Sequence, residues 1–132
     1  MIIDPDSADI SKQDPDLRYE HIIQSAVSSQ EIWGCGTAEG WSLVQDKNRQ
    51  KVFLVWPAED FAAAWIASQK GPETPRRIPL AEFLETWVPR FLADGIRIGV
   101  FPTPIWPMAV CLPDAFKEDI EEEAGTLPPE AA

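Results

Sequence analysis

Val52-Phe-Leu-Val-Trp56, followed at once by Pro57, is the stretch of sequence that decides the fold. All of its positions are apolar, so both faces of an extended strand would be hydrophobic there. Such a strand is typical of a sheet that is covered on both sides. We therefore expect residues 52–56 to form a buried strand around which the other elements are arranged.

Proline marks the places where helices are expected to begin. It follows an apolar segment three times, at Trp56-Pro57, Ile78-Pro79 and Leu112-Pro113, and it follows an aspartate at Asp14-Pro15. Proline suits the first helical turn because that turn leaves its N–H groups unpaired and favours the fixed φ of the ring. We expect helices at about 15–29, 57–70, 79–94 and 113–124, the third bent by Pro89.

Four more strands are predicted, at residues 31–35, 41–45, 96–101 and 108–112. The first two flank a turn that contains Gly36 and Gly40, which indicates a hairpin. Residues 71–77 are expected to be a connector between two helices. The order is helix, three strands, two helices, two strands and helix, which is typical of an α+β fold. We expect one largely antiparallel five-stranded sheet with the helices packed on it.

Length and composition indicate a single core. The chain has 132 residues, of which 45% are hydrophobic, and it includes six Trp and six Phe. This is sufficient for one domain. We expect a flexible acidic leader at 1–14, a single domain at 15–124 and a flexible tail at 125–132. Trp56, Trp65 and Trp87 fall on faces predicted to be buried, so we expect them in the core.

The net charge of -11 is concentrated at the two ends of the chain. Residues 1–16 carry a net charge of -4 and residues 114–132 a net charge of -6. The few Lys and Arg residues form no extended cluster, which argues against nucleic-acid binding. The sequence also has neither a signal-peptide pattern nor a long apolar run, so we expect a cytoplasmic protein without a membrane partner.

Aromatic and glycine positions resemble a known family. The motifs are Trp33-Gly34, Gly40-Trp41, Trp56-Pro57, Phe83-Leu84 with Trp87, and Gly99-Val-Phe101. In order and spacing, over about residues 19–120, they are similar to the bacterial family called domain of unknown function 2750. The succession of strand, Trp-Pro and helix also resembles, more loosely, the N-terminal domain of the enhanced serine sensitivity proteins. The resemblance implies a small cytosolic bacterial protein without a known cofactor, and it transfers no catalytic residue.

The residues interpreted as a contact surface are three tryptophans and three acids. Trp106 lies among three prolines in a predicted loop, and Trp33 and Trp41 lie on the predicted hairpin. Tryptophan is enriched where proteins contact one another. The acidic residues of the last helix, among them Glu118, Asp119 and Glu122, would attract a basic partner. The sequence therefore predicts a non-enzymatic protein-binding module, of the kind found among inhibitors, immunity proteins and regulatory partners.

Two alternatives from other classes stay open. The first is a sensor of a small molecule or peptide, with a tryptophan-lined cleft between the hairpin and the helices. The second is a hydrolase or redox enzyme in which His21 activates Cys35 or Cys111. That dyad requires a lowered thiol pKa and hydrogen-bond geometry. We expect two reduced thiols, no catalytic residue, no cofactor and no metal, because His21 and two cysteines are too few for a zinc site.

Overall fold

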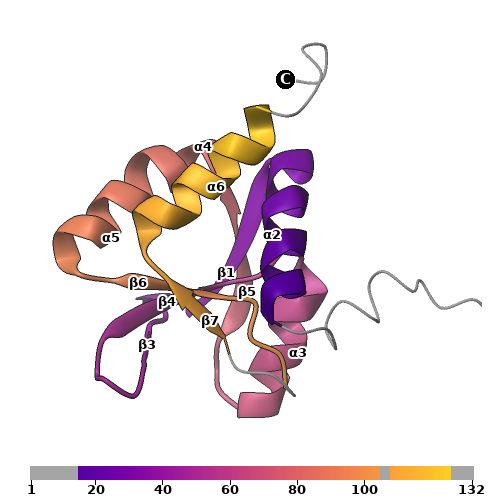
Figure 1. Cartoon of the computed structure of the whole chain (residues 1–132). Coiled ribbons are helices and arrows are strands. Elements are labelled where there is room, and N and C mark those ends of the chain that lie inside the picture. Colours follow the sequence, from indigo (N-terminus) through magenta and orange to yellow (C-terminus); the bar gives the residue numbers. More distant parts are fainter. Residues whose placement is uncertain (1–14, 105–107, 126–132) are drawn as a thin grey trace, which may run out of the picture.

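The computed structural model describes residues 15–104 and 108–125 (Figure 1). The helices are α2 (Pro15–Ser29), α3 (Glu59–Gln69), α4 (Leu80–Glu82), α5 (Val88–Asp94) and α6 (Pro113–Gly125), with a π-helical turn, η1 (Phe83–Trp87), between α4 and α5. The strands are β1 (Glu31–Thr37), β2 (Gly40–Trp41), β3 (Val44–Gln45), β4 (Lys51–Val55), β5 (Thr74–Pro79), β6 (Arg97–Val100) and β7 (Ala109–Cys111). The predicted leader and most of the predicted tail lie outside the described residues.

In the described part of the chain the strands form two sheets. One has the order β2-β1-β5 and the other has the order β3-β4-β6-β7. All pairs are antiparallel except β4 and β6, which run parallel. The prediction of an α+β fold is confirmed, but the prediction of one five-stranded sheet was wrong.

The buried strand predicted at residues 52–56 is found as β4, which ends at Val55, and Trp56 follows it as an isolated bridge to Trp33. Residues Val52 to Val55 of β4 are all buried, and the strand lies between β3 and β6. On one face, the ring of Phe53 meets the rings of Phe83 and Phe91, which come from η1 and α5. The predicted covering of this strand is thus found in the structure.

Residues Trp33 and Trp56 join the two sheets. The N–H of Trp33 donates to the carbonyl of Trp56 at 3.0 Å, and the N–H of Trp56 donates to the carbonyl of Trp33 at 2.8 Å. The indole of Trp56 is fully buried and donates to the carbonyl of Pro102 at 2.8 Å. Trp56 therefore links β1 to the segment that follows β6.

The expected connector at 71–77 is in fact largely strand, since β5 begins at Thr74 and pairs with β1 over its whole length. The backbone N–H and C=O of Trp33 bond to Trp56, so Trp33 and Arg77 form a pair without hydrogen bonds between β1 and β5. The N–H of Arg77 therefore points away from β1. Pro75 and Pro79 lie two residues to either side of Arg77, so their backbone nitrogens also point away from β1. Their missing N–H groups are therefore not needed by the ladder, and β5 is an edge strand, where proline is tolerated.

The strand expected at 41–45 is broken into two short strands. Gly40 and Trp41 pair with β1, whereas Val44 and Gln45 pair with β4. One continuous strand cannot serve both partners because they belong to different sheets. This break, together with β5, accounts for the difference between the predicted and observed sheets.

The prolines mark helix starts with one displacement. α2 begins at Pro15, α6 begins at Pro113, and α4 begins directly after Pro79. α3 begins at Glu59 rather than at Pro57. Pro57 itself is buried beside the end of β4, and Ala58 adopts an extended conformation before the helix starts.

The helix that contains Pro89 has an irregular turn, and this turn precedes the proline. In η1 the N–H of Val88 donates to the carbonyl of Phe83, five residues earlier. A π-helical turn of this kind is wider than an α-helical turn and shifts the positions that follow. Leu92, expected on the buried face, is consequently 48% exposed, while Phe91 is buried.

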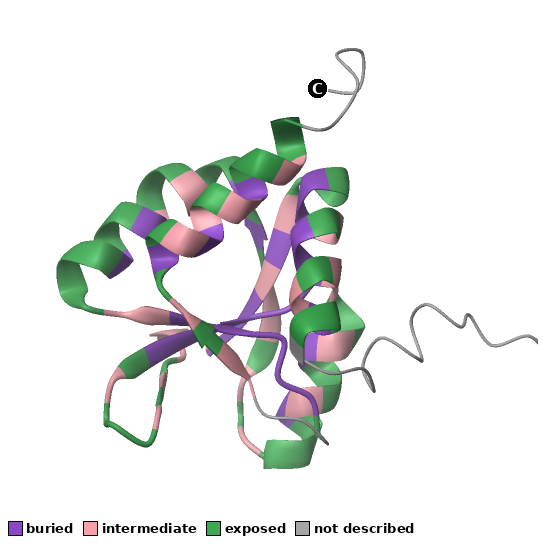
Figure 2. Ribbon diagram, viewed as in Figure 1, coloured by how far each residue is buried: buried purple, intermediate pink, exposed green. Residues whose placement is uncertain are grey.

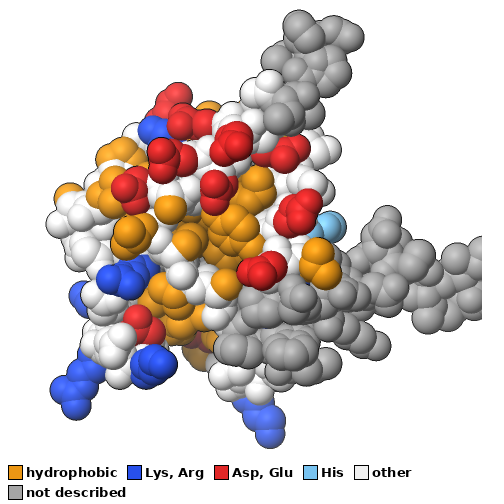
Figure 3. Space-filling view, in the orientation of Figure 1, with side chains coloured by type: hydrophobic (Ala, Val, Ile, Leu, Met, Phe, Trp, Pro, Cys, Tyr) orange, Lys and Arg blue, Asp and Glu red, His pale blue; other side chains and the backbone are white. Residues whose placement is uncertain are grey.

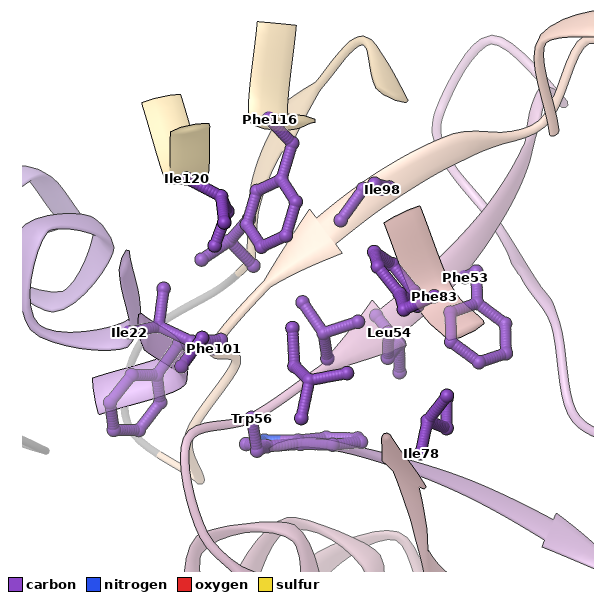
Figure 4. Close-up of a cluster of buried hydrophobic side chains, with 14 of the residues drawn as sticks. Ile22, Phe53, Leu54, Trp56, Ile78, Phe83, Ile98, Phe101, Phe116 and Ile120 are labelled. Atoms are coloured by element: carbon purple, nitrogen blue, oxygen red, sulfur yellow. The ribbon is translucent and has the colours of Figure 1, made fainter. Parts of the chain in front are cut away.

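The core lies between the helices and the two sheets. Buried residues line the inner sides of α2, α6 and η1 and the central strands (Figure 2). Phe83, Phe116 and Ile98 come from different elements and point toward one another (Figure 4). Arg18 on α2 is also buried, and its guanidinium donates to the carbonyl of Phe101. Within the described ranges, no helix is both long and apolar enough to cross a membrane.

Replacing Trp56 by Phe should destabilise the protein by about 1–3 kcal/mol, because the buried Pro102 carbonyl loses its donor. Urea unfolding followed by circular dichroism measures the change in the free energy of unfolding. Trp65→Phe is the matched control, since Trp65 is only half-buried. Equal effects of the two substitutions would contradict the structural role given to the Trp56 indole.

Candidate functional site

The three predicted tryptophans are in different situations. Trp106 lies outside the described residues. Trp33 is half-buried on β1, and its indole donates to Glu31 at 2.8 Å. Trp41 is half-buried, and its ring lies edge-on to that of Trp87 at 4.7 Å. Trp33 and Trp41 are thus both engaged within the fold, and Trp41 contacts Trp87, which lines the groove described below.

The acidic residues of α6 are divided between solvent and the fold. Glu118 and Glu122 are exposed, as expected for a solvated helix face. Asp119 is half-buried and accepts a hydrogen bond from the hydroxyl of Tyr19, which joins α6 to α2. Burial, together with this bond, raises the pKa of Tyr19. Asp119 therefore has a structural role that the sequence did not reveal.

The cysteines lie in surroundings that favour the neutral thiol. Cys35 and Cys111 are both free. Burial raises the pKa of Cys35 to about 11 and that of Cys111 to about 12. A nucleophilic cysteine needs the opposite shift. The ring of His21 lies beside that of Phe101, with 6.3 Å between ring centroids.

A groove opens between α5 and the loop that joins β2 to β3. Its volume is about 360 Å³, and its lining residues are Leu43, Thr86, Trp87, Arg90, Phe91, Asp94 and Ile96. We call it the α5 groove. Leu43 is 40% exposed, so an apolar wall is open to solvent. Arg90 and Asp94 supply charges at the rim, where their side chains are largely exposed.

The wide turn η1 and its neighbours position Trp87 at the wall of the groove. The sequence had predicted that Trp87 would lie in the core. Trp87 is the last residue of η1 and is half-buried. Its indole donates to Glu82 at 3.0 Å, and its ring is held by Trp41 and Phe53. The guanidinium of Arg76 lies 4.1 Å from the centroid of the Trp41 ring, which is a cation–π contact. These contacts hold Trp87 in place as an aromatic lining residue of the groove.

A smaller hollow adjoins the α5 groove. Its volume is about 160 Å³, and it shares Phe91 and Ile96 with the groove. Its other lining residues are Gln50, Leu92, Gly95, Arg97, Leu112 and Pro113. Leu92 and Leu112 are about half exposed, so the apolar surface extends from α5 toward the start of α6.

Charged side chains of opposite sign occupy opposite ends of this side of the molecule. Figure 3 shows acidic side chains gathered over α6 and basic side chains around the turn between β3 and β4, with hydrophobic side chains between them. The groove and the hollow are lined chiefly by apolar residues, and their charged lining residues are Arg90, Arg97 and Asp94. This arrangement is suited to binding an apolar group that carries a charge.

The lining of the α5 groove offers little to chemistry. It contains one hydroxyl, that of Thr86, and no Cys or His. Within residues 15–104 and 108–125, no group of three or more His, Cys, Asp or Glu side chains could hold a metal ion. Sequence reasoning missed Leu43, Trp87 and Arg90 as site residues. Pro89 was the available signal, because a proline inside a helix produces irregular turns at which side chains change direction.

Comparison with known protein families identifies a family model that matches most of the chain. This family model is described as protein of unknown function (DUF2750) and matches residues 19–120. No curated protein and no solved structure was found to match the chain. The family match confirms the resemblance drawn from the aromatic and glycine motifs.

The two thiols should react with iodoacetamide far more slowly in the native protein than in urea at about pH 8, because only the thiolate reacts. The folded state favours the neutral thiols, so their contribution to stability is fully present below the ordinary pKa of 9.0. This contribution is lost as the pH rises through the raised pKa values, about 11 for Cys35 and about 12 for Cys111. Mass spectrometry of the alkylated protein measures the rates. Rapid native alkylation near neutral pH would instead favour the enzyme hypothesis.

Proposed function

The chain belongs to the DUF2750 family of proteins of unknown function, and from its surface we propose that it is a non-enzymatic protein-binding module. In this proposal it works in the bacterial cytoplasm, as an inhibitor, immunity protein or regulatory partner does, by holding another polypeptide. The α5 groove is the recognition site, and it receives an apolar side chain of the partner.

One observation carries the proposal: an open apolar groove has a rigid aromatic wall and a charged rim. Protein interfaces are centred on apolar pockets that contain aromatic residues and Arg, surrounded by polar groups. Trp87 and Phe91 supply the aromatic surface, and Arg90 and Asp94 lie at the rim. The raised pKa values of both cysteines disfavour the competing nucleophile hypothesis.

The second candidate is a sensor of a small apolar molecule. The volume of about 360 Å³ is within the range of ligand pockets. Trp87 lines the groove and its ring contacts that of Trp41, which supports this candidate, although neither Trp33 nor Trp41 is itself a lining residue. Displacement experiments show whether both kinds of ligand use the groove, because a small molecule in the groove would compete with a bound peptide.

We expect peptides selected by the protein from a random displayed library to share a large apolar residue and to bind in the α5 groove. Leu43→Ser should weaken their binding about tenfold, since it removes an apolar wall. Thr86→Trp should abolish it by filling the groove. Isothermal titration calorimetry with the selected peptides measures both effects.

Leu17→Ser is the matched control, because Leu17 is 44% exposed but lies on α2, away from the groove. It should leave binding unchanged. If the selected peptides bind Leu43→Ser and Thr86→Trp as tightly as the wild type, the α5 groove is not the recognition site.

A further inference from the structure

We infer that the polypeptide held in the α5 groove carries carboxylates beside its apolar anchor. This inference rests on the proposed function and adds the chemistry of the partner. It differs from the expectation drawn from α6, whose acidic residues would select a basic partner. The observation behind it is the excess of basic side chains beside the groove and the adjoining hollow, whose lining residues include Arg90 and Arg97 but only one acid, Asp94.

Basic side chains border the groove and the adjoining hollow on the side that faces the sheet formed by β3, β4, β6 and β7. Arg90 lines the groove and Arg97 lines the hollow. Val52 pairs with Arg97, which places the preceding residue, Lys51, beside the same end of β6. The turn that leads into β4 carries Lys47 and Arg49, both exposed. Four of these cations thus lie on the neighbouring strands β4 and β6 and the turn that leads into β4, in a protein whose net charge is -11.

The fold itself makes little use of these cations. In the described part of the chain, Lys47, Arg49, Lys51 and Arg97 form no ion pair. Arg90 is 3.9 Å from Asp94 across one helical turn, and both side chains are largely exposed. A pair this open to solvent contributes little and can exchange partners at low cost. The basic residues are therefore available to an external carboxylate.

The apolar floor explains where those carboxylates would lie. Phe91 and Ile96 are shared by the groove and the hollow, so an anchor seated on them adjoins both the groove that Arg90 lines and the hollow that Arg97 lines. Arginine is suited to carboxylates because its planar group can donate two parallel hydrogen bonds. A segment with a large apolar residue flanked by Asp or Glu satisfies both features of the surface.

The test uses the full chain and three labelled peptides that share a central Leu-Phe pair and differ only in their flanks, which are Asp, Ser or Lys. Fluorescence anisotropy should show the Asp-flanked peptide binding most tightly, by about threefold per favourable charge. The preference should shrink as salt is raised, because exposed charges are screened.

Charge reversal at the rim then distinguishes a charge effect from loss of structure. Arg90→Glu should reverse the order, so that the Lys-flanked peptide binds more tightly than the Asp-flanked one. Lys70→Glu is the matched control, an exposed cation at the end of α3 and outside the groove, and it should leave the order unchanged. A simple loss of folding cannot produce a reversed preference.

The failures of the two proposals are distinguishable. Binding of all three peptides with equal affinity, lost in Leu43→Ser, overturns the charge inference and keeps the groove as the site. No binding of any peptide, or binding unaffected by Leu43→Ser, overturns both. Light scattering measures the oligomeric state and tests whether the groove is occupied by a second copy of this chain. If the wild type is a dimer and Arg90→Glu is a monomer, the partner is that second copy and the inference of a different, acidic polypeptide is overturned.

Discussion

The pair of backbone hydrogen bonds between Trp33 and Trp56 is the constraint on which the rest of the structure depends. These bonds are the point at which the two sheets are joined. They turn the backbone of Trp33 away from β5, so that strand must meet β1 in the register that tolerates its prolines. The buried Trp56 indole then holds the chain after β6 at Pro102. Strand order, strand register and the path of a loop thus follow from one junction.

Much of the fold could be predicted because its signals are local. The apolar run of β4, the prolines at the starts of α2 and α6, and Gly95 at the end of α5 act on their immediate neighbours. The sheets were harder because pairing is a choice between distant partners. Pro75 resembles a connector residue and Pro79 a helix start until the pairing of β1 shows that their missing N–H groups are not required.

The candidate site was predicted less well for a related reason. The predicted contact residues, tryptophans and acids, follow from residue type alone, whereas the exposure of a side chain depends on packing. Trp87 shares a helical repeat with buried residues, and only the wide turn before Pro89 brings it to the wall of a groove. Leu43 belongs to the break in a strand that the sequence presented as continuous. Both residues acquire their roles from irregular backbone, which periodicity does not describe.

The place of β5 in the chain has an evolutionary consequence. β4 and β6 are parallel neighbours in one sheet, and the segment that connects them contains β5, which belongs to the other sheet. β1, the partner of β5, precedes all three along the chain. No cut of the polypeptide can therefore separate the sheets into two continuous pieces. Neither sheet can be inherited, exchanged or lost as a module, so recombination must transfer this architecture as a whole.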